Sequence, residues 1–215
     1  MLIEKGTKLV MVGDSVTDAE RKRPVGEGRG DDIGRSYVAL VNALFTAACP
    51  QERIRVMNMG IAGDTSRSLL ERFQSDVLDL EPDWLTIMIG VNDVWRQFDA
   101  PLQPEIHVYP DEYEANLVRM LEMCQGQVKQ VVLFTPVFME INRSDEMRGM
   151  LDSYSDIVRR TASRYGALLV DVQGAYDDVF GHMHPMNIAW DRVHPNMTGH
   201  MIIARAFLKS VGFVW

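Results

Sequence analysis

The segment KLVMVGDS, residues 8–15, passes directly from an apolar run into a polar turn. An unbroken apolar run of this length is typical of a strand buried on both faces of a parallel sheet. Gly13 and Asp14 favour a turn, so Ser15 is expected at the open end of that strand. A serine placed there presents its hydroxyl and its backbone N–H at the edge of the sheet where ligands bind.

Further apolar runs of the same kind follow along the chain, and each ends in a turn or a loop. They cover residues 54–57, 84–89, 131–134 and 168–172. Apolar residues at helical spacing fill the intervals between them. Strands that alternate with helices build right-handed crossover units and a parallel sheet covered on both faces. We therefore expect an α/β fold, a three-layer αβα sandwich with a central five-stranded parallel sheet, in one domain over residues 1–215.

Composition and charge restrict the classes of partner. The chain has 215 residues, of which 47% are hydrophobic and 24% are charged, so disordered and coiled-coil classes are excluded. Its 22 basic and 30 acidic residues give a net charge of −8. An acidic surface repels phosphate backbones and anionic lipids, so we expect no nucleic-acid partner and no membrane partner. The absence of a secretory signal and of a CxxC motif at Cys49 or Cys124 predicts a cytoplasmic protein.

A serine nucleophile requires a general base, usually a histidine that is oriented by a carboxylate. Among the five histidines, His194 stands out because Asp191 lies three residues before it. One short loop can therefore hold both partners, with Asp191 facing the ring nitrogen that points away from Ser15. We interpret Ser15, His194 and Asp191 as a candidate catalytic triad.

Each of these residues also has a plain structural interpretation. Ser15 could simply cap a helix, and taken alone that interpretation is the stronger one. The pair Asp191 and His194 could be a surface DxxH pattern with no role. A metal site is a third alternative, because four histidines lie within nineteen residues, at positions 182, 184, 194 and 200. The spacings of known zinc motifs are absent, so we expect no metal and no other cofactor.

A developing oxyanion needs hydrogen-bond donors aimed at it. Gly63 can bring a backbone N–H close because it has no side chain, and Asn92 can offer its amide group. Each follows a different strand, so both are expected to meet Ser15 at one edge of the sheet, where the backbone N–H of Ser15 is a third donor. Ordinary turn chemistry is the alternative for Gly63 and Asn92.

These residues together resemble a known family. The segments GDSV (13–16), GIAG (60–63), GVND (90–93) and DRVHP (191–195) are similar, in order and spacing, to the sequence blocks of the SGNH, or GDSL-type, hydrolases. Val16 stands where that family usually has Leu or Ile. The resemblance implies a flavodoxin-like SGNH fold, with Ser15 as nucleophile, His194 as base and Asp191 as its orienting group. It also implies an oxyanion hole made by Ser15, Gly63 and Asn92.

A narrower resemblance is to the intracellular GDSL acetylxylan esterases of Gram-positive bacteria. Residues 87–97, 189–195 and 199–201 carry it, whereas residues 196–198 differ from the expected pattern. It implies a serine esterase that removes O-acetyl groups from acetylated xylo-oligosaccharides through an acetyl-enzyme on Ser15. It further implies a homo-oligomer, with a ring-shaped octamer as one form. Trp215 fits an interface anchor and a tail packed on its own core equally well.

Other side chains flank these blocks and are candidate substrate contacts. They are Asp14, Trp95, Arg96, Tyr109 and Trp190. Packing of the catalytic loop is the alternative role for the aromatic members of this set.

Rival functions remain open at the level of sequence. A broader-specificity esterase, a lysophospholipase or a thioesterase would share the catalytic residues, but an enzyme acting on long acyl chains requires a long apolar groove. A carbohydrate-binding scaffold could share the fold, although it would have no use for the complete catalytic set. The glycine-rich segment 26–30 lacks a following GK[ST] and precedes Asp31 and Asp32, so we interpret it as a connector or lid, not as a phosphate loop.

Overall fold

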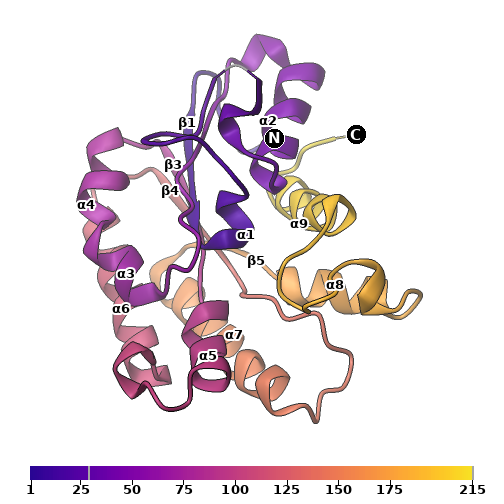
Figure 1. Cartoon of the computed structure of the whole chain (residues 1–215). Helices are drawn as coiled ribbons and strands as arrows, with labels where there is room; N and C mark the ends of the chain where they lie inside the picture. Colours follow the sequence, from indigo (N-terminus) through magenta and orange to yellow (C-terminus); the bar gives the residue numbers. More distant parts are fainter. Residues whose placement is uncertain (29, 215) are drawn as a thin grey trace.

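A parallel sheet forms the centre of the molecule (Figure 1). The structure, a computed structural model, describes residues 1–28 and 30–214, and within them the sheet has five strands in the order β2-β1-β3-β4-β5. The strands are β1 (Lys8–Gly13), β2 (Arg55–Asn58), β3 (Trp84–Met88), β4 (Gln130–Phe134) and β5 (Leu168–Val170). All four strand pairings are parallel, which confirms the expected sheet.

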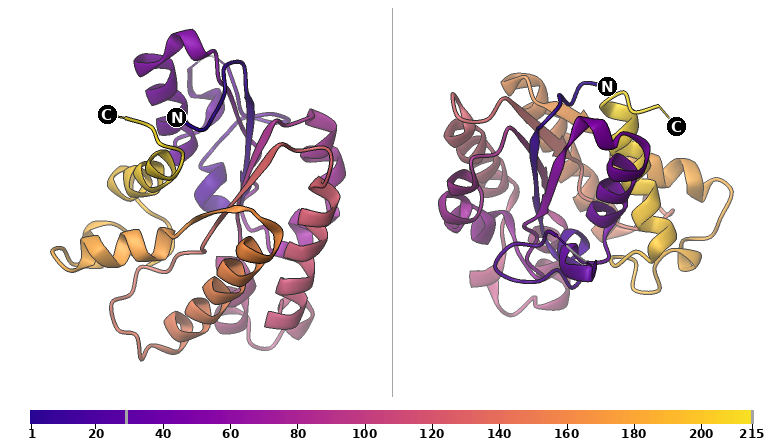
Figure 2. Two further views of the ribbon diagram at one scale, coloured as in Figure 1. Left: turned by 180° about the vertical axis from the view of Figure 1, so that it is seen from behind. Right: turned by 90° about the horizontal axis from the view of Figure 1, so that it is seen from above.

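Helices cover both faces of this sheet, as the sandwich architecture requires. They are α1 (Ser15–Asp18), α2 (Tyr37–Ala48), α3 (Ser66–Glu71), α4 (Phe73–Asp76), α5 (Val91–Asp99), α6 (Pro110–Cys124), α7 (Glu146–Tyr165), α8 (Val172–Phe180) and α9 (Met197–Ser210). Short 3₁₀ turns η1 (Gly30–Ile33), η2 (Pro50–Glu52), η3 (Leu78–Leu80), η4 (Pro104–Ile106) and η5 (Pro185–Asn187) lie between them. Helices α2, α8 and α9 lie on one side, and α3, α4, α6 and α7 lie on the other (Figure 2).

Strand β1 explains why its sequence is apolar without interruption. Val10 and Val12 face the cluster that includes α3, α4, α6 and α7, whereas Leu9 and Met11 face the cluster that includes α2, α8 and α9. All four side chains are fully buried. Alternate side chains of a strand point to opposite faces, so a strand covered on both sides is apolar at every position.

The strand ends differ by a few residues from those expected. Strand β3 ends at Met88 and not at residue 89, and β5 ends at Val170 because Val172 already begins helix α8. The register pairs Gly13 with Met88 and Met11 with Asn58. The loops that follow β1, β2 and β3 therefore begin at one edge of the sheet.

Two glycines allow these loops to pack closely. A Cβ on Gly13 would lie 2.3 Å from the carbonyl oxygen of Met88, and a Cβ on Gly60 would lie 2.3 Å from the backbone nitrogen of Asp18. Neither distance is possible for a real side chain, so the approach of the three loops depends on glycine at both positions.

Within the described residues, no helix is both long and apolar enough to cross a membrane. Cys124 is buried and Cys49 is partly buried, and neither is in a disulfide. Trp215 and Arg29, the latter in the glycine-rich segment, lie outside the described residues. The neighbouring Gly26 forms an isolated antiparallel bridge with Asn58, and Glu27 pairs with Arg55, so this segment is attached beside β2.

Candidate active site

Ser15 is the first residue of helix α1 and follows β1 directly. The helix is capped by Asp14, whose Oδ1 accepts a hydrogen bond of 2.9 Å from the backbone N–H of Val16. The capping role considered for Ser15 is therefore wrong, because the preceding residue fills it. Asp14 is only 2% exposed, so it caps the helix from a buried position, and its role as a candidate substrate contact stays a prediction.

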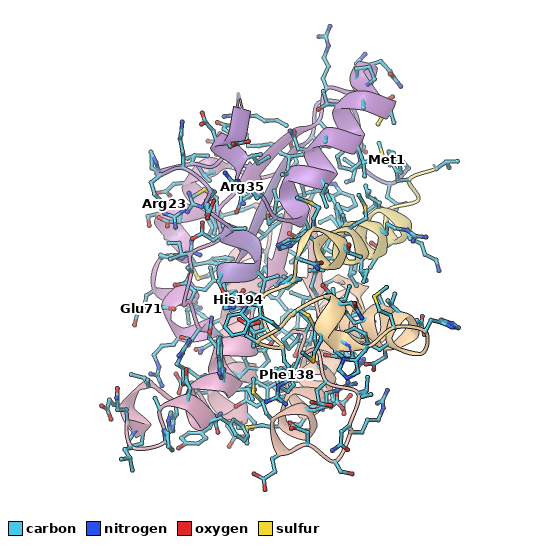
Figure 3. The ribbon with its side chains drawn as sticks, turned by 45° about the vertical axis from the view of Figure 1, so that its right-hand side comes forward. Met1, Arg23, Arg35, Glu71, Phe138 and His194 are labelled. Atoms are coloured by element: carbon cyan, nitrogen blue, oxygen red, sulfur yellow. The ribbon has the colours of Figure 1, made fainter. Side chains whose placement is uncertain are left out.

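The hydroxyl of Ser15 is thus free to meet His194, which comes from the loop before α9. Their Oγ and Nε2 atoms lie 2.9 Å apart. Figure 3 shows His194 close to the short helix α1. The other ring nitrogen of His194, Nδ1, lies 2.6 Å from Oδ2 of Asp191. The structure therefore brings these three predicted residues together in one hydrogen-bonded chain.

The carboxylate of Asp191 is held in its ionised form by hydrogen bonds. Burial raises its pKa, but the backbone N–H groups of His194 and Val193 donate to Oδ1 at 2.8 and 3.0 Å, and the His194 ring adds a further bond. The net effect lowers the pKa of Asp191 below its ordinary value. An ionised Asp191 fixes the orientation of the ring and stabilises an imidazolium when one forms.

The loop that carries Asp191 and His194 is anchored through Arg192. Arg192 adopts a left-handed backbone conformation with a φ of 66°, and its carbonyl accepts a hydrogen bond of 2.8 Å from the N–H of Met139. Its guanidinium lies 4.9 Å from the ring centroid of Phe138 and pairs with Glu140 and Asp145 at 3.0 and 3.4 Å. The segment before α7 therefore positions the loop.

Gly63 and Asn92 lie at adjoining points of the same edge. Gly63 is exposed, and a Cβ built on it would have no atom within 4 Å, so its surroundings are open. The side chain of Asn92 is 1% exposed and donates one amide hydrogen to the carbonyl oxygen of Asp64 at 2.9 Å. Because an asparagine amide has two hydrogens, the second remains for a ligand.

Arg96 and Trp95 join this region to the catalytic histidine. Nη2 of Arg96 donates to Oδ1 of Asn92 at 3.1 Å, and the guanidinium also pairs with Asp99. The guanidinium lies 5.0 Å from the ring centroid of Trp95, and that ring lies 5.8 Å from the ring of His194. Two of the candidate substrate contacts are therefore beside the site.

Tyr109 and Trp190 are more exposed than Trp95 and Arg96. Tyr109 is 51% exposed, and its hydroxyl lies 3.3 Å from Nδ1 of His107. In the part of the chain that the structure describes, no hydrogen bond or ring contact joins Tyr109 to Ser15 or His194. Trp190 adjoins Asp191 but is 86% exposed, so it does not pack the loop.

Two buried carboxylates that the sequence did not single out hold the Gly63 loop. Asp93 is fully buried and accepts hydrogen bonds from the backbone N–H and the hydroxyl of Ser66 at 3.0 and 2.5 Å. Oδ2 of Asp18 accepts from the N–H of Ala62 at 2.9 Å. The signal for Asp93 was its place in the GVND segment, where an ionisable residue follows Asn92 directly. Burial raises the pKa of Asp93 to about 7.

Two members of the histidine cluster, His184 and His200, have structural roles. Nδ1 of His184 accepts from the N–H of Met186 at 3.2 Å and caps the turn η5. His200 is buried in α9, and burial lowers its pKa to about 4. Across residues 1–28 and 30–214, no group of three or more His, Cys, Asp or Glu side chains is arranged to hold a metal ion.

The fold and this site define the chain as a hydrolase of the GDSL class. Residues 11–202 match the GDSL-like Lipase/Acylhydrolase family, and the chain belongs to that family. It is 47% identical, over 215 residues that cover 100% of this chain and 98% of the relative, to an acetylxylan esterase of Geobacillus stearothermophilus. It is therefore a carboxylic ester hydrolase.

Solved structures agree with this assignment. The crystal structure of Axe2, an acetylxylan esterase from Geobacillus stearothermophilus, superposes with a TM-score of 0.98, covering 100% of this chain and 98% of that chain at 47% identity. LAE5, an alpha/beta hydrolase enzyme from the metagenome of Lake Arreo in Spain, gives a TM-score of 0.97 at 50% identity, covering 99% and 98%. Structures of the catalytic mutants S15A, D191A and H194A of Axe2 are also known.

Proposed function

We propose that this esterase removes acetyl groups from acetylated xylo-oligosaccharides, with Ser15, His194 and Asp191 as its catalytic triad. The observation that carries the proposal is the hydrogen-bonded chain from Ser15 through His194 to Asp191 at the open edge of the sheet. The catalytic mutants of the relative Axe2 remove a serine, an aspartate and a histidine, the residue types found here at positions 15, 191 and 194.

In the first half of the proposed reaction, His194 accepts the proton of Ser15 as the hydroxyl oxygen attacks the acetyl carbonyl carbon. The negative charge that develops on the carbonyl oxygen is met by the N–H groups of Ser15 and Gly63 and by the free amide hydrogen of Asn92. Donors already fixed in place stabilise this charge without reorganisation during the reaction. Collapse of the tetrahedral intermediate then breaks the ester bond, and the sugar oxygen takes from His194 the proton that came from Ser15.

In the second half, water attacks the acetyl-enzyme. His194 accepts a proton from the water and returns it to Oγ of Ser15, while the same donors hold the second oxyanion. Acetate leaves and the free serine is restored. Asp191 keeps the ring in one orientation throughout and stabilises the imidazolium form in both halves.

The cellular setting and assembly are part of the same proposal. Cys49 and Cys124 lie outside any disulfide, as in a protein of a reducing compartment such as the cytoplasm. We propose a homo-oligomer, with a ring-shaped octamer as the form to test, as the resemblance to the GDSL acetylxylan esterases implies. Light scattering coupled to size-exclusion chromatography measures the number of subunits directly, and a monomeric mass would refute the assembly.

The decisive experiment measures acetate release from acetylated xylo-oligosaccharides. Ser15→Ala should lower turnover by about 10⁴–10⁶-fold, because the nucleophile is lost while the oxyanion donors remain. A fluorophosphonate should label the wild type but not this variant. If Ser15→Ala retains a tenth of the wild-type rate, the triad is wrong. If p-nitrophenyl octanoate is hydrolysed faster than p-nitrophenyl acetate, the substrate is a long acyl ester and not an acetylated sugar.

A further inference from the structure

A cleft with a volume of about 430 Å³ lies next to the triad, between helix α5 and the start of helix α7. These two helices lie side by side (Figure 1). The cleft is lined by Trp95, Phe98, Asp99, Asp145, Glu146, Met147 and Arg192. The catalytic scheme uses none of these side chains directly, so the role of the cleft is open.

The cleft borders the catalytic histidine. Trp95, which lines it, lies against the ring of His194 at a centroid distance of 5.8 Å, and Arg192 belongs to the same loop as His194. In a serine esterase the alcohol half of the ester must meet the histidine, because its oxygen takes the proton from Nε2 when the ester bond breaks. The cleft is therefore on the side of the site that faces the alcohol half.

The volume of the cleft also indicates that it binds the alcohol half of the ester and not the acetyl group. An acetyl group has only two carbons and needs no space of this size, whereas binding pockets for whole small molecules have volumes of about 300–1,000 Å³. The tetrahedral centre itself is served by Ser15 and its donors. A large cleft beside His194 thus accommodates the part of the substrate that varies in length.

The lining indicates the chemical class of that part. Phe98 is 36% exposed, and with Trp95 it offers apolar ring surface to the C–H groups of a sugar ring. Three carboxylates and one guanidinium offer acceptors and donors for hydroxyl groups. Asp145 is already paired with Arg192, and Asp99 with Arg96, but Glu146 is exposed and forms no ion pair among the described residues.

The same lining excludes other alcohol halves. A long alkyl chain would displace water from Glu146, which has no ion pair among the described residues, and would offer it no hydrogen bond, which costs free energy. A phosphate-bearing group would meet an excess of negative charge, because three acidic side chains face a single basic one. A neutral molecule with many hydroxyl groups meets neither penalty.

We propose that this cleft is the subsite for the sugar chain that leaves as the alcohol, and that Phe98 and Glu146 contact it. The inference rests on the proposed deacetylation of oligosaccharides and adds a location and two recognition residues to it. Loss of these contacts should lower kcat/KM more for substrates with a sugar leaving group than for p-nitrophenyl acetate. The leaving group of p-nitrophenyl acetate is p-nitrophenol, which has none of the hydroxyl groups of a sugar.

The test compares Phe98→Ala and Glu146→Gln with matched controls elsewhere on the surface. Leu169→Ala removes an apolar side chain of similar exposure, 37% against 36%, and Glu71→Gln neutralises another exposed glutamate. The measured quantity is kcat/KM for acetylated xylotriose divided by kcat/KM for p-nitrophenyl acetate. Each cleft variant should lower this ratio by about tenfold, and the controls should leave it unchanged.

A second measurement keeps the proposal testable if Phe98→Ala folds poorly. Unacetylated xylotriose should inhibit hydrolysis of p-nitrophenyl acetate competitively in the wild type, and its inhibition constant should rise by about tenfold in the exposed-site variant Glu146→Gln. An unchanged ratio and an unchanged inhibition constant would overturn the subsite. If acetate were still released from the sugar substrate in that case, the proposed function would stand without it.

Discussion

At the scale of single residues, the side chain of Asn92 is held in one orientation from both ends. Its amide nitrogen donates to the carbonyl of Asp64, and its amide oxygen accepts from Arg96. Rotation of the amide by 180° would place two donors together and two acceptors together, so the observed orientation is strongly favoured. The remaining amide hydrogen therefore has a fixed direction, which is what an oxyanion donor requires.

Arg96 should consequently act through Asn92. We expect Arg96→Met to lower kcat for p-nitrophenyl acetate by about tenfold with little change in KM, because a loosely held amide stabilises the oxyanion less. In an Asn92→Ala background the same substitution should cause no further loss. A double-mutant cycle of steady-state rates measures this coupling. Equal losses in both backgrounds would show that Arg96 acts through Trp95 or Asp99 instead.

Asp14 gives the protein a stability that depends on pH. Burial, together with the nearby carboxylates Asp93 and Asp64, raises its pKa from 3.8 to about 7. The folded protein therefore retains a proton that the unfolded chain releases at lower pH. The resulting stability is fully present below pH 3.8 and is lost as the pH rises through about 7.

Asp14→Asn should remove this part of the pH dependence. Asparagine keeps the cap, since its oxygen can accept from the N–H of Val16, and it carries no charge to bury. At about pH 8 the variant should exceed the wild type in free energy of unfolding by about 4 kcal/mol, and at about pH 4 the difference should be small. Urea denaturation at both pH values measures it. A constant difference between the two proteins would refute the assigned cause.

The sequence was informative about these residues to different degrees. The contact between Ser15 and His194 was predicted from two motifs, GDSV near the N-terminus and DRVHP near the C-terminus. The choice between Asp14 and Ser15 as the helix cap did not, because both residue types are good caps and they are adjacent. Only the backbone geometry at the end of β1 decides which side chain turns back to the helix.

At the scale of elements, the loop that carries Asp191 and His194 has a strained backbone and is held by contacts with the segment before α7. Arg192 is left-handed, a conformation that a residue with a side chain adopts at a cost. Its ion pairs with Glu140 and Asp145 and its contact with Phe138 offset that cost. The side chain of Arg192 therefore helps to hold the loop conformation that places Asp191 and His194.

Two substitutions at Arg192 distinguish the cost of its left-handed backbone from the stabilisation by its ion pairs. Both Arg192→Ala and Arg192→Gly lose the ion pairs, but only glycine adopts the left-handed backbone freely. We expect the alanine variant to be less stable than the glycine variant by about 1 kcal/mol. Both should have a lower kcat than the wild type because the loop is released. Thermal or urea unfolding of the purified variants ranks them, and equal or reversed stabilities would contradict the strain.

The elements themselves were more predictable than the contacts between them. The three inner strands could be located because burial on both faces leaves an apolar run in the sequence, and the edge strand β5 is apolar as well although its Leu169 is 37% exposed. The role of Arg148 could not be predicted, because a charged residue in a helix is normally exposed. It is 1% exposed in α7 and forms hydrogen bonds of 2.9 and 2.6 Å with Asp177, 29 residues away, and one of 2.5 Å with the carbonyl of Glu140. Such pairings are set by tertiary packing.

At the scale of the whole molecule, the site is assembled from four segments that meet only in the folded chain. The segments around Ser15, Gly63 and Asn92 follow the neighbouring strands β1, β2 and β3, whereas Asp191 and His194 come from the loop between α8 and α9. Convergence of the first three was predictable from parallel topology, because strand ends share an edge. The last segment was expected at the site because Asp191 lies three residues before His194 and because of the family resemblance, and not from the topology of the sheet.

The segment that carries Ser15 and the loop that carries Asp191 and His194 should differ in local stability. Ser15 follows a strand that is buried at every position after Lys8, but much of the loop before α9 is exposed, including Met186 at 71% and Trp190 at 86%. Segments with few buried contacts open at a lower free energy than the core. We therefore expect esterase activity to be lost in urea about 1 M below the midpoint of the far-ultraviolet circular dichroism transition. Full recovery of activity on dilution shows that the early loss is reversible opening of the loop. Coincident midpoints would instead mean that the catalytic loop and the sheet unfold as one cooperative unit.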